Sequence, residues 1–190
     1  MQVGLLTILT ATFGVGCATT SSTGATALKP TIGANVDLSR YQVASVIPFD
    51  TASGQKIDPS IGVKFSEDVA TRLQSDFGPL FREVRKAPPT GKADELIVTG
   101  TIKTYDPGSR TARLILIGLG AAILKGELIL KDAVDNRVLY SAPFDKLWAW
   151  GGAMGASKGI EDMMIESSAA VANTIARAKG WNPPVSSKPK

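Results

Sequence analysis

The chain of 190 residues contains 21 lysines and arginines against 17 aspartates and glutamates, which gives a net charge of +4 at neutral pH. Because the excess positive charge is spread along the chain, we expect no nucleic-acid partner, which would require a basic cluster on one face. There is no histidine and a single cysteine, so the commonest general base is missing and a zinc site is not expected. We therefore predict a protein that is not an enzyme and that holds no metal and no cofactor.

The first 16 residues carry no charged side chain and end in small residues directly before Cys17. This run is shorter than the ~20 apolar residues of a transmembrane helix, but it is typical of the apolar part of a secretory signal peptide. The junction resembles the bacterial lipobox, in which the cysteine after the cleavage site carries the lipid. The resemblance predicts a lipoprotein signal peptide over residues 1–16 and a lipidated Cys17. The alternatives are an ordinary signal peptide with an incidental cysteine and an apolar N-terminal strand.

The residue after the cysteine bears on localisation. Ala18 stands there rather than an aspartate, and by the same resemblance this implies a lipoprotein of the outer membrane that faces the periplasm. The membrane is then a partner through the lipid anchor.

Residues 17–40 are rich in Ala, Thr, Ser and Gly, with three charged side chains and no aromatic one. A segment of this composition buries too little apolar surface to offset the entropy that it loses on ordering. We predict a flexible tether over residues 17–40, which would hold a folded domain about 25–30 Å from its anchor. The segment 181–190 is predicted to be a disordered tail.

The predicted folded domain, residues 41–180, opens with a strand, because residues 41–49 are almost continuously apolar. Asp58-Pro59 is a helix-start signal, and Gly78-Pro79 is a helix-stop signal. Between them, apolar residues recur every four positions and predict an amphipathic helix. They are Ile61, Phe65, Val69, Leu73 and Phe77.

Four further strands and a second helix complete the predicted domain, mainly from the alternation and the helical spacing of apolar residues. The strands are expected at 81–84, 96–103, 124–131 and 138–144, a turn-rich connector at 105–110, a tight turn at 135–136 and the helix at 160–179. This order predicts one α/β domain, in which a mixed sheet of four to five strands carries two helices on one face.

Thirteen residues between Gly100 and Gly152 have a recognisable layout. They are Gly100, Ile102, Tyr105, Pro107, Gly108, Ser109, Arg110, Arg113, Gly118, Gly120, Asp132, Gly151 and Gly152. On these residues the chain, from about Tyr41 to Ala178, resembles a bacterial lipoprotein family known as domain of unknown function 4410. The resemblance implies an α/β fold and a place in the cell envelope, and it implies no particular chemistry.

Two pairs of side chains near these glycines are candidates for a binding surface. Arg110 and Arg113 would contact an acidic group of a glycan, a lipid or a protein; alternatively they are simple surface charges, one of them capping backbone carbonyls. Trp148 and Trp150, beside Gly151-Gly152, would stack on a sugar ring or anchor a protein partner. Alternatively the two tryptophans cover the open end of the core.

Residues 114–124 form a run of eleven residues without a charged side chain. The run is too short to cross a bilayer as a helix, and an exposed apolar edge would favour aggregation. Three interpretations are open: a buried strand or loop, a surface that contacts another copy or a partner, and a hairpin that inserts into a membrane.

No motif in the sequence indicates a reaction. The glycine-rich segment 151–159 does not have the register of a phosphate-binding loop, and no Ser, Lys or Tyr stands in a motif for an activated nucleophile. The leading interpretation is an envelope lipoprotein whose non-catalytic domain binds a protein partner in the envelope. The alternatives are a self-assembling structural or secretion-type oligomer built through residues 114–124, and a peptidoglycan or carbohydrate binder that uses Trp148 and Trp150.

Overall fold

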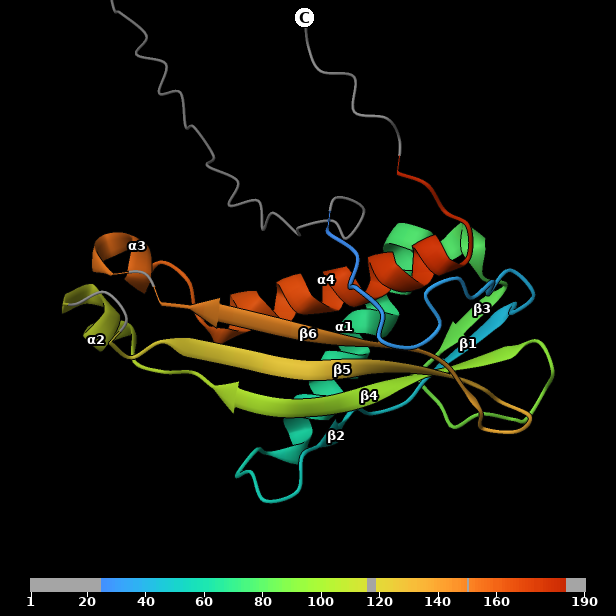
Figure 1. Cartoon of the computed structure of the whole chain (residues 1–190), viewed down its shortest axis with the longest axis horizontal. Coiled ribbons are helices and arrows are strands. Elements are labelled where there is room, and N and C mark those ends of the chain that lie inside the picture. Colours follow the sequence, from blue (N-terminus) through green and yellow to red (C-terminus); the bar gives the residue numbers. More distant parts are fainter. Residues whose placement is uncertain (1–24, 116–118, 150, 184–190) are drawn as a thin grey trace, which may run out of the picture.

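The structure, a computed structural model, describes residues 25–115, 119–149 and 151–183. The predicted signal peptide, Cys17 and Trp150 lie outside these residues, as do most of the predicted tail and residues 116–118 of the apolar run. The described chain forms one mixed sheet with two long helices (Figure 1). The predicted α/β class is confirmed.

The sheet has the strand order β3-β1-β4-β5-β6. β1 (Val43–Val46) lies between β3 (Glu83–Arg85) and β4 (Glu95–Asp106) and is parallel to both. β5 (Ala122–Asp132) pairs antiparallel with β4, and β6 (Val138–Trp148) returns beside it as a long hairpin. A two-residue strand that was not predicted, β2 (Asp50–Thr51), pairs in parallel with β4.

The two long helices, α1 (Pro59–Phe77) and α4 (Ile160–Ala178), cover the same face of the sheet (Figure 1). Alternate residues of β5, such as Leu124 and Leu128, are fully buried on that face. They form one core with Phe65 of α1 and Val171 of α4. Because burial of side chains of this size stabilises a fold by about 1.5–3 kcal/mol each, this core is what holds the helices on the sheet.

The ends of α1 follow the signals in the sequence. The Asp58 carboxylate accepts the Ser60 N–H at 2.9 Å, and Pro59 is the first helical residue, where its missing N–H costs nothing. The helix ends at Phe77 and is followed by a single 3-10 turn, η2 (Gly78–Leu80). The predicted helix boundaries are therefore confirmed to within two residues.

The prediction of a flexible tether is wrong for residues 25–40, which cross β6 and α4; we call residues 25–38 the strap. The Leu28 N–H donates to Thr174 Oγ1 of α4 at 2.7 Å, and Ile32 exchanges two backbone hydrogen bonds with Ser141 of β6. Leu38 is fully buried. Composition misled the prediction because three apolar side chains of the segment, Leu28, Val36 and Leu38, pack on the core, and backbone pairing with the edge of β6 holds the segment further.

The predicted connector at 105–110 is also different in the structure. β4 continues to Asp106, and residues 110–115 form a short helix, α2 (Arg110–Ile115), which begins where the Ser109 hydroxyl accepts the Ala112 N–H at 3.1 Å. A second short helix, α3 (Gly152–Ala156), follows Gly151. The two short helices lie side by side beyond one end of the sheet (Figure 1).

Candidate functional site

The end of the sheet that carries α2 and α3 also carries an unusual amount of exposed apolar surface. Of the ten large apolar side chains that are exposed in the described residues, five lie here. We call these five residues the apolar tip: Leu114, Ile115, Leu119, Leu147 and Met154. The exposed fraction reaches 75% for Ile115 and 65% for Met154. Clustered exposure of this kind marks a surface that contacts another molecule.

The apolar run 114–124 is thus divided in two. Leu114, Ile115 and Leu119 are exposed, so the interpretation as a buried strand or loop is wrong for the first part of the run. Ala122 and Leu124 are fully buried in β5, where that interpretation holds. The exposed part is the surface that the other two interpretations require.

The buried side chain of Arg113 connects the segments that carry the apolar tip. Its side chain is fully buried, and its guanidinium donates to the carbonyl oxygens of Pro107, Gly120 and Lys158, the last at 3.2 Å. The planar guanidinium has enough N–H groups to bond several carbonyls at once, so it ties α2 to the turn at Gly120 and to the link between α3 and α4. The expected role of Arg113 in a binding surface is therefore corrected, because no ligand can reach it.

Arg110 lies on the surface, away from the Arg113 site. Its guanidinium pairs with Glu161 of α4 at 3.2 Å, and both side chains are more than half exposed. Exposed pairs of this kind contribute little to stability. The structure therefore does not bring the two arginines together on one anion.

Trp148 lies at the end of β6 and is partly buried against the core. The Lys158 ammonium lies 4.9 Å from the centre of its ring, and the same ammonium pairs with Glu166. One face of the indole is thus covered by a cation that is itself neutralised. Gly151 is the residue before α3, and Gly152 is the first residue of that helix, so the glycines begin the helix beside the tip.

The cations around the apolar tip are paired with carboxylates. Lys125 pairs with Asp145 at 3.0 Å, and Lys146 pairs with Glu166 at 3.8 Å. Arg110 pairs with Glu161, and Lys158 shares Glu166 with Lys146. The tip is therefore an apolar surface inside a rim of paired charges.

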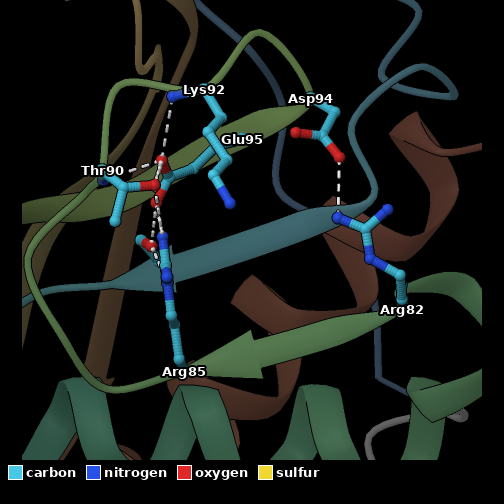
Figure 2. A network of polar contacts seen from close by, with 7 residues as sticks. Arg82, Arg85, Thr90, Lys92, Asp94 and Glu95 are labelled. Atoms are coloured by element: carbon cyan, nitrogen blue, oxygen red, sulfur yellow. Dashed lines mark hydrogen bonds and ion pairs between the residues drawn. The ribbon is translucent and has the colours of Figure 1, made fainter.

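A buried carboxylate at the other end of the sheet was missed by the sequence analysis. The Glu95 side chain is fully buried and accepts hydrogen bonds from Ser45, Arg85, Thr90 and the Lys92 N–H (Figure 2). Burial alone would raise the pKa of Glu95, but the hydrogen bonds outweigh it and lower the pKa to about 2. The only signal in the sequence was an acidic residue at the start of an apolar strand.

The Glu95 network ties a loop to the sheet and leaves no room for chemistry. Each carboxylate oxygen is occupied by donors from the loop before β4 or from β1 and β3, so Glu95 stays ionised and cannot act as an acid or a base near neutral pH. Nearby, Arg82 and Asp94 add an exposed pair at 2.8 Å (Figure 2). Asp132 is similarly engaged, by the hydroxyl of Tyr41 at 2.7 Å and the N–H of Val134 at 2.9 Å.

The described part of the chain carries neither a cluster of metal-ligating side chains nor a membrane-spanning helix. Within residues 25–115, 119–149 and 151–183, no three acidic, histidine or cysteine side chains gather closely enough to hold a metal ion. None of the helices in these ranges has the length and apolar character needed to cross a membrane.

Comparison with known proteins identifies a family. Residues 31–159 match the family described as Domain of unknown function (DUF4410), which confirms the resemblance found in the layout between Gly100 and Gly152. No curated protein matches the chain.

Several solved structures share the fold. A dodecamer of a singly substituted PelC from Paraburkholderia phytofirmans is 16% identical, with a TM-score of 0.55, over 78% of this chain and 95% of that one. A second PelC dodecamer structure from the same organism is 14% identical, with a TM-score of 0.52, over 77% of this chain and 95% of that one. Protein XCC0632 from Xanthomonas campestris, of the family DUF330, is 9% identical, with a TM-score of 0.52, over 82% of this chain and 95% of that one. At these identities the likeness establishes the fold alone.

Proposed function

The chain belongs to the DUF4410 family, and on that premise we propose that it is a non-catalytic, lipid-anchored component of the bacterial cell envelope that assembles with copies of itself. The contact between copies is the apolar tip. The observation that carries this proposal is the exposure of five large apolar side chains on one end of the sheet, held in place by the buried Arg113.

The rim of the apolar tip favours a protein surface as its occupant. A surface that meets an anionic bilayer gains from cations that have no acidic partner, at about 1 kcal/mol each. The cations around this tip are already paired with Glu161, Asp145 and Glu166. A second copy, which brings the same apolar residues and the same paired cations, covers the tip without leaving an unpaired cation in the contact.

The edges of the sheet are poorly suited to assembly, and this also supports the tip as the contact. The outward N–H and C=O of Ser141 on β6 are taken by the strap, and the next outward position on β6 is Pro143, which has no N–H. The opposite edge, β3, is only three residues long. Short edges and edge prolines are features that oppose sheet-to-sheet pairing.

The structures of similar fold support assembly as well. Both PelC structures are dodecamers. Closed assemblies of identical subunits repeat one contact in every copy, and the apolar tip is a surface from which such a contact can be built.

The proposed location in the cell envelope is based on Cys17 and the lipobox-like residues before it. We place the protein at the outer membrane, facing the periplasm, because Ala18 follows the cysteine. A non-catalytic role is supported by the two buried carboxylates, since Glu95 and Asp132 are both engaged in structural hydrogen bonds.

The assembly is tested by the native mass of the purified protein in mild detergent. We expect a mass of at least two chains, because a contact in which the tips of two copies meet joins the copies in pairs. We expect Ile115→Asp to reduce the mass toward the monomer, because a charge in an apolar contact is costly to desolvate. Val63→Asp is the matched control, since Val63 is also an exposed apolar residue on a helix but lies outside the tip. A wild-type monomer would favour a different envelope protein as the occupant of the tip.

The anchor is tested separately by intact mass and membrane fractionation, with Cys17→Ser beside the wild type. We expect the wild type to lose residues 1–16, to gain the mass of the lipid and to sediment with membranes, and we expect the variant to do none of these. If the variant behaves as the wild type does, the anchor assignment is wrong.

A further inference from the structure

Because the strap packs on the domain, only a few residues separate the proposed lipid anchor at Cys17 from the folded part of the chain. The first residue of the strap, Ala25, comes only eight residues after Cys17. The chain is then fixed at Leu28, whose N–H donates to Thr174 Oγ1 and whose carbonyl oxygen accepts the hydroxyl of Tyr140 at 3.3 Å. The backbone of Thr31 adds a bond to the Ser141 carbonyl at 2.8 Å.

This geometry limits the distance between the proposed anchor and the domain. A chain of eight residues spans at most about 26–29 Å, even when it is fully extended. The surface from which the strap emerges must therefore stay close to the membrane that holds the anchor.

The same surface carries cations without acidic partners. Within the described residues neither Lys29 nor Arg177 forms an ion pair, and both are exposed. Arg177 lines an open hollow together with Leu28 and Pro30, the two neighbours of Lys29. The acidic residue of the strap, Asp37, accepts the Ser39 N–H at 2.8 Å.

The other described end of the chain lies beside this surface. The Trp181 N–H donates to the carbonyl oxygen of Ala176, the neighbour of Arg177, at 3.0 Å. The surface beside the strap therefore carries two exposed cations, Lys29 and Arg177, that form no ion pair with a described residue. The cations named around the apolar tip are paired.

We infer that the surface formed by strap residues 25–32 and the last turns of α4 faces the bilayer, and that Lys29 and Arg177 contact anionic lipid headgroups there. This inference rests on the lipid anchor at Cys17 proposed above. Juxtamembrane cations are attracted by anionic headgroups over about one Debye length, ~10 Å at 0.1 M salt.

The orientation leaves the apolar tip free for neighbouring copies. The tip lies at the start of α4, where Arg110 meets Glu161, whereas the strap is fixed at Thr174. At 1.5 Å per residue, the thirteen residues between Glu161 and Thr174 separate the two sites by about 20 Å along the helix. Copies anchored in one membrane can thus meet through their tips while each keeps its strap against the bilayer.

The test uses the lipidated protein in vesicles of phosphatidylcholine with phosphatidylglycerol and a headgroup-labelled nitroxide lipid as quencher. Because the Cys17 sulfur carries the lipid, an introduced cysteine is the only free thiol and takes a fluorophore at one position. We choose Thr26→Cys in the strap and Asn182→Cys beside it, and Ala153→Cys in α3 next to the tip. The fourth position is Ser53→Cys on the loop after β2, which lies on the opposite side of the domain from α4 (Figure 1). All four positions are exposed.

We expect several-fold stronger quenching at residues 26 and 182 than at residue 53. Lys29→Glu with Arg177→Glu should weaken the quenching at residue 26 in anionic vesicles, and Lys56→Glu, an exposed lysine on the loop after β2, should not. Equal quenching at residues 26 and 53, or the strongest quenching at residue 153, would overturn the orientation. Unchanged quenching in the charge-reversed variant would overturn the headgroup contact.

The outcomes separate this inference from the proposed function. A protein that lacks the mass of the lipid and does not float with the vesicles overturns the anchor and this inference together. A lipidated, floating protein with uniform quenching overturns only the inference. The self-assembly is judged independently, by native mass.

Discussion

Two buried charged side chains, Glu95 and Arg113, each hold a surface segment onto the sheet. Glu95 accepts bonds from Thr90 and Lys92 and so fixes the loop before β4. Arg113 donates to three carbonyl oxygens and so fixes the end that carries α2 and α3. A buried charge is tolerated when it is paired and fully hydrogen-bonded, and removal of one partner leaves the other uncompensated.

For Glu95 this predicts a large loss of stability on Glu95→Gln. Arg85 would lose its carboxylate, and because Arg85 is itself partly exposed, we expect the free energy of unfolding to fall by about 3 kcal/mol, the lower end of the range for a broken buried pair. Asp94→Asn is the control, because the exposed pair with Arg82 should cost less than about 1 kcal/mol. Urea unfolding at pH 7 measures both, and equal effects of the two substitutions would contradict the assignment.

The same residue predicts a pH dependence with a definite sign. The folded-state pKa of Glu95 lies at about 2, below its usual 4.5, so its contribution to stability is complete above pH 4.5 and is lost as the pH falls from 4.5 toward 2. We expect the difference in unfolding free energy between wild type and Glu95→Gln to shrink over this interval. A difference that stays constant down to pH 2 would mean that Glu95 is not ionised in the folded protein.

For Arg113 the predicted effect is local. Arg113→Ala leaves the carbonyl oxygens of Pro107, Gly120 and Lys158 without this donor, and we expect the opening free energy of α2 and α3 to fall by about 1–3 kcal/mol. Amide hydrogen exchange should accelerate in these two helices and not in the middle of α4. Arg110→Ala, which removes only an exposed pair, should leave the exchange of α2 nearly unchanged.

At the scale of the element, the strap depends on the left-handed backbone conformation of Gly33. Gly33 has a φ of +75°, and a Cβ placed there would lie 2.1 Å from the carbonyl oxygen of Leu139. Gly54 has a similar φ of +85° with nothing within 4 Å of such a Cβ. Substitution of Gly54 by alanine therefore tests backbone strain alone, and substitution of Gly33 tests strain together with a steric clash.

We expect Gly33→Ala to detach the strap from β6, because strain and clash act together. Limited proteolysis should then cut within residues 25–38, and in the vesicle experiment the difference in quenching between residues 26 and 53 should diminish. Gly54→Ala carries the strain of ~1–2 kcal/mol for a non-glycine left-handed residue and should leave the strap protected. Equal protection in both variants would show that the strap does not need the close approach at Gly33.

The elements with a strong local pattern were predictable from the sequence, and those decided by distant contacts were not. α1 and the strands around Val98 and Leu128 follow the spacing of their own apolar residues. The strap is held by residues more than 100 positions away, such as Thr174 and Ser141, and no local pattern records such contacts. The apolar tip was recognised as a run, but its exposure depends on α2 packing on α3, and Leu147 and Met154 carried no signal of their own.

At the scale of the whole molecule, two parts of the surface differ in their charge. The cations named around the apolar tip are paired, and the surface beside the strap carries Lys29 and Arg177 without acidic partners among the described residues. The two surfaces should respond to salt in opposite ways, because salt screens exposed charges but does not weaken apolar burial. This contrast distinguishes the two proposals without any change of surface charge.

We expect the native mass of the assembly to persist when the salt concentration is raised, and to rise further in sulfate, because excluded salts strengthen apolar association. The headgroup quenching at residue 26 should instead fall in high salt, where the Debye length shrinks from ~10 Å at 0.1 M to ~3 Å at 1 M. Cooling should weaken the assembly, since apolar burial stabilises less at low temperature. Dissociation of the assembly by salt would show that ion pairs such as Arg110–Glu161, rather than the apolar tip, join the copies.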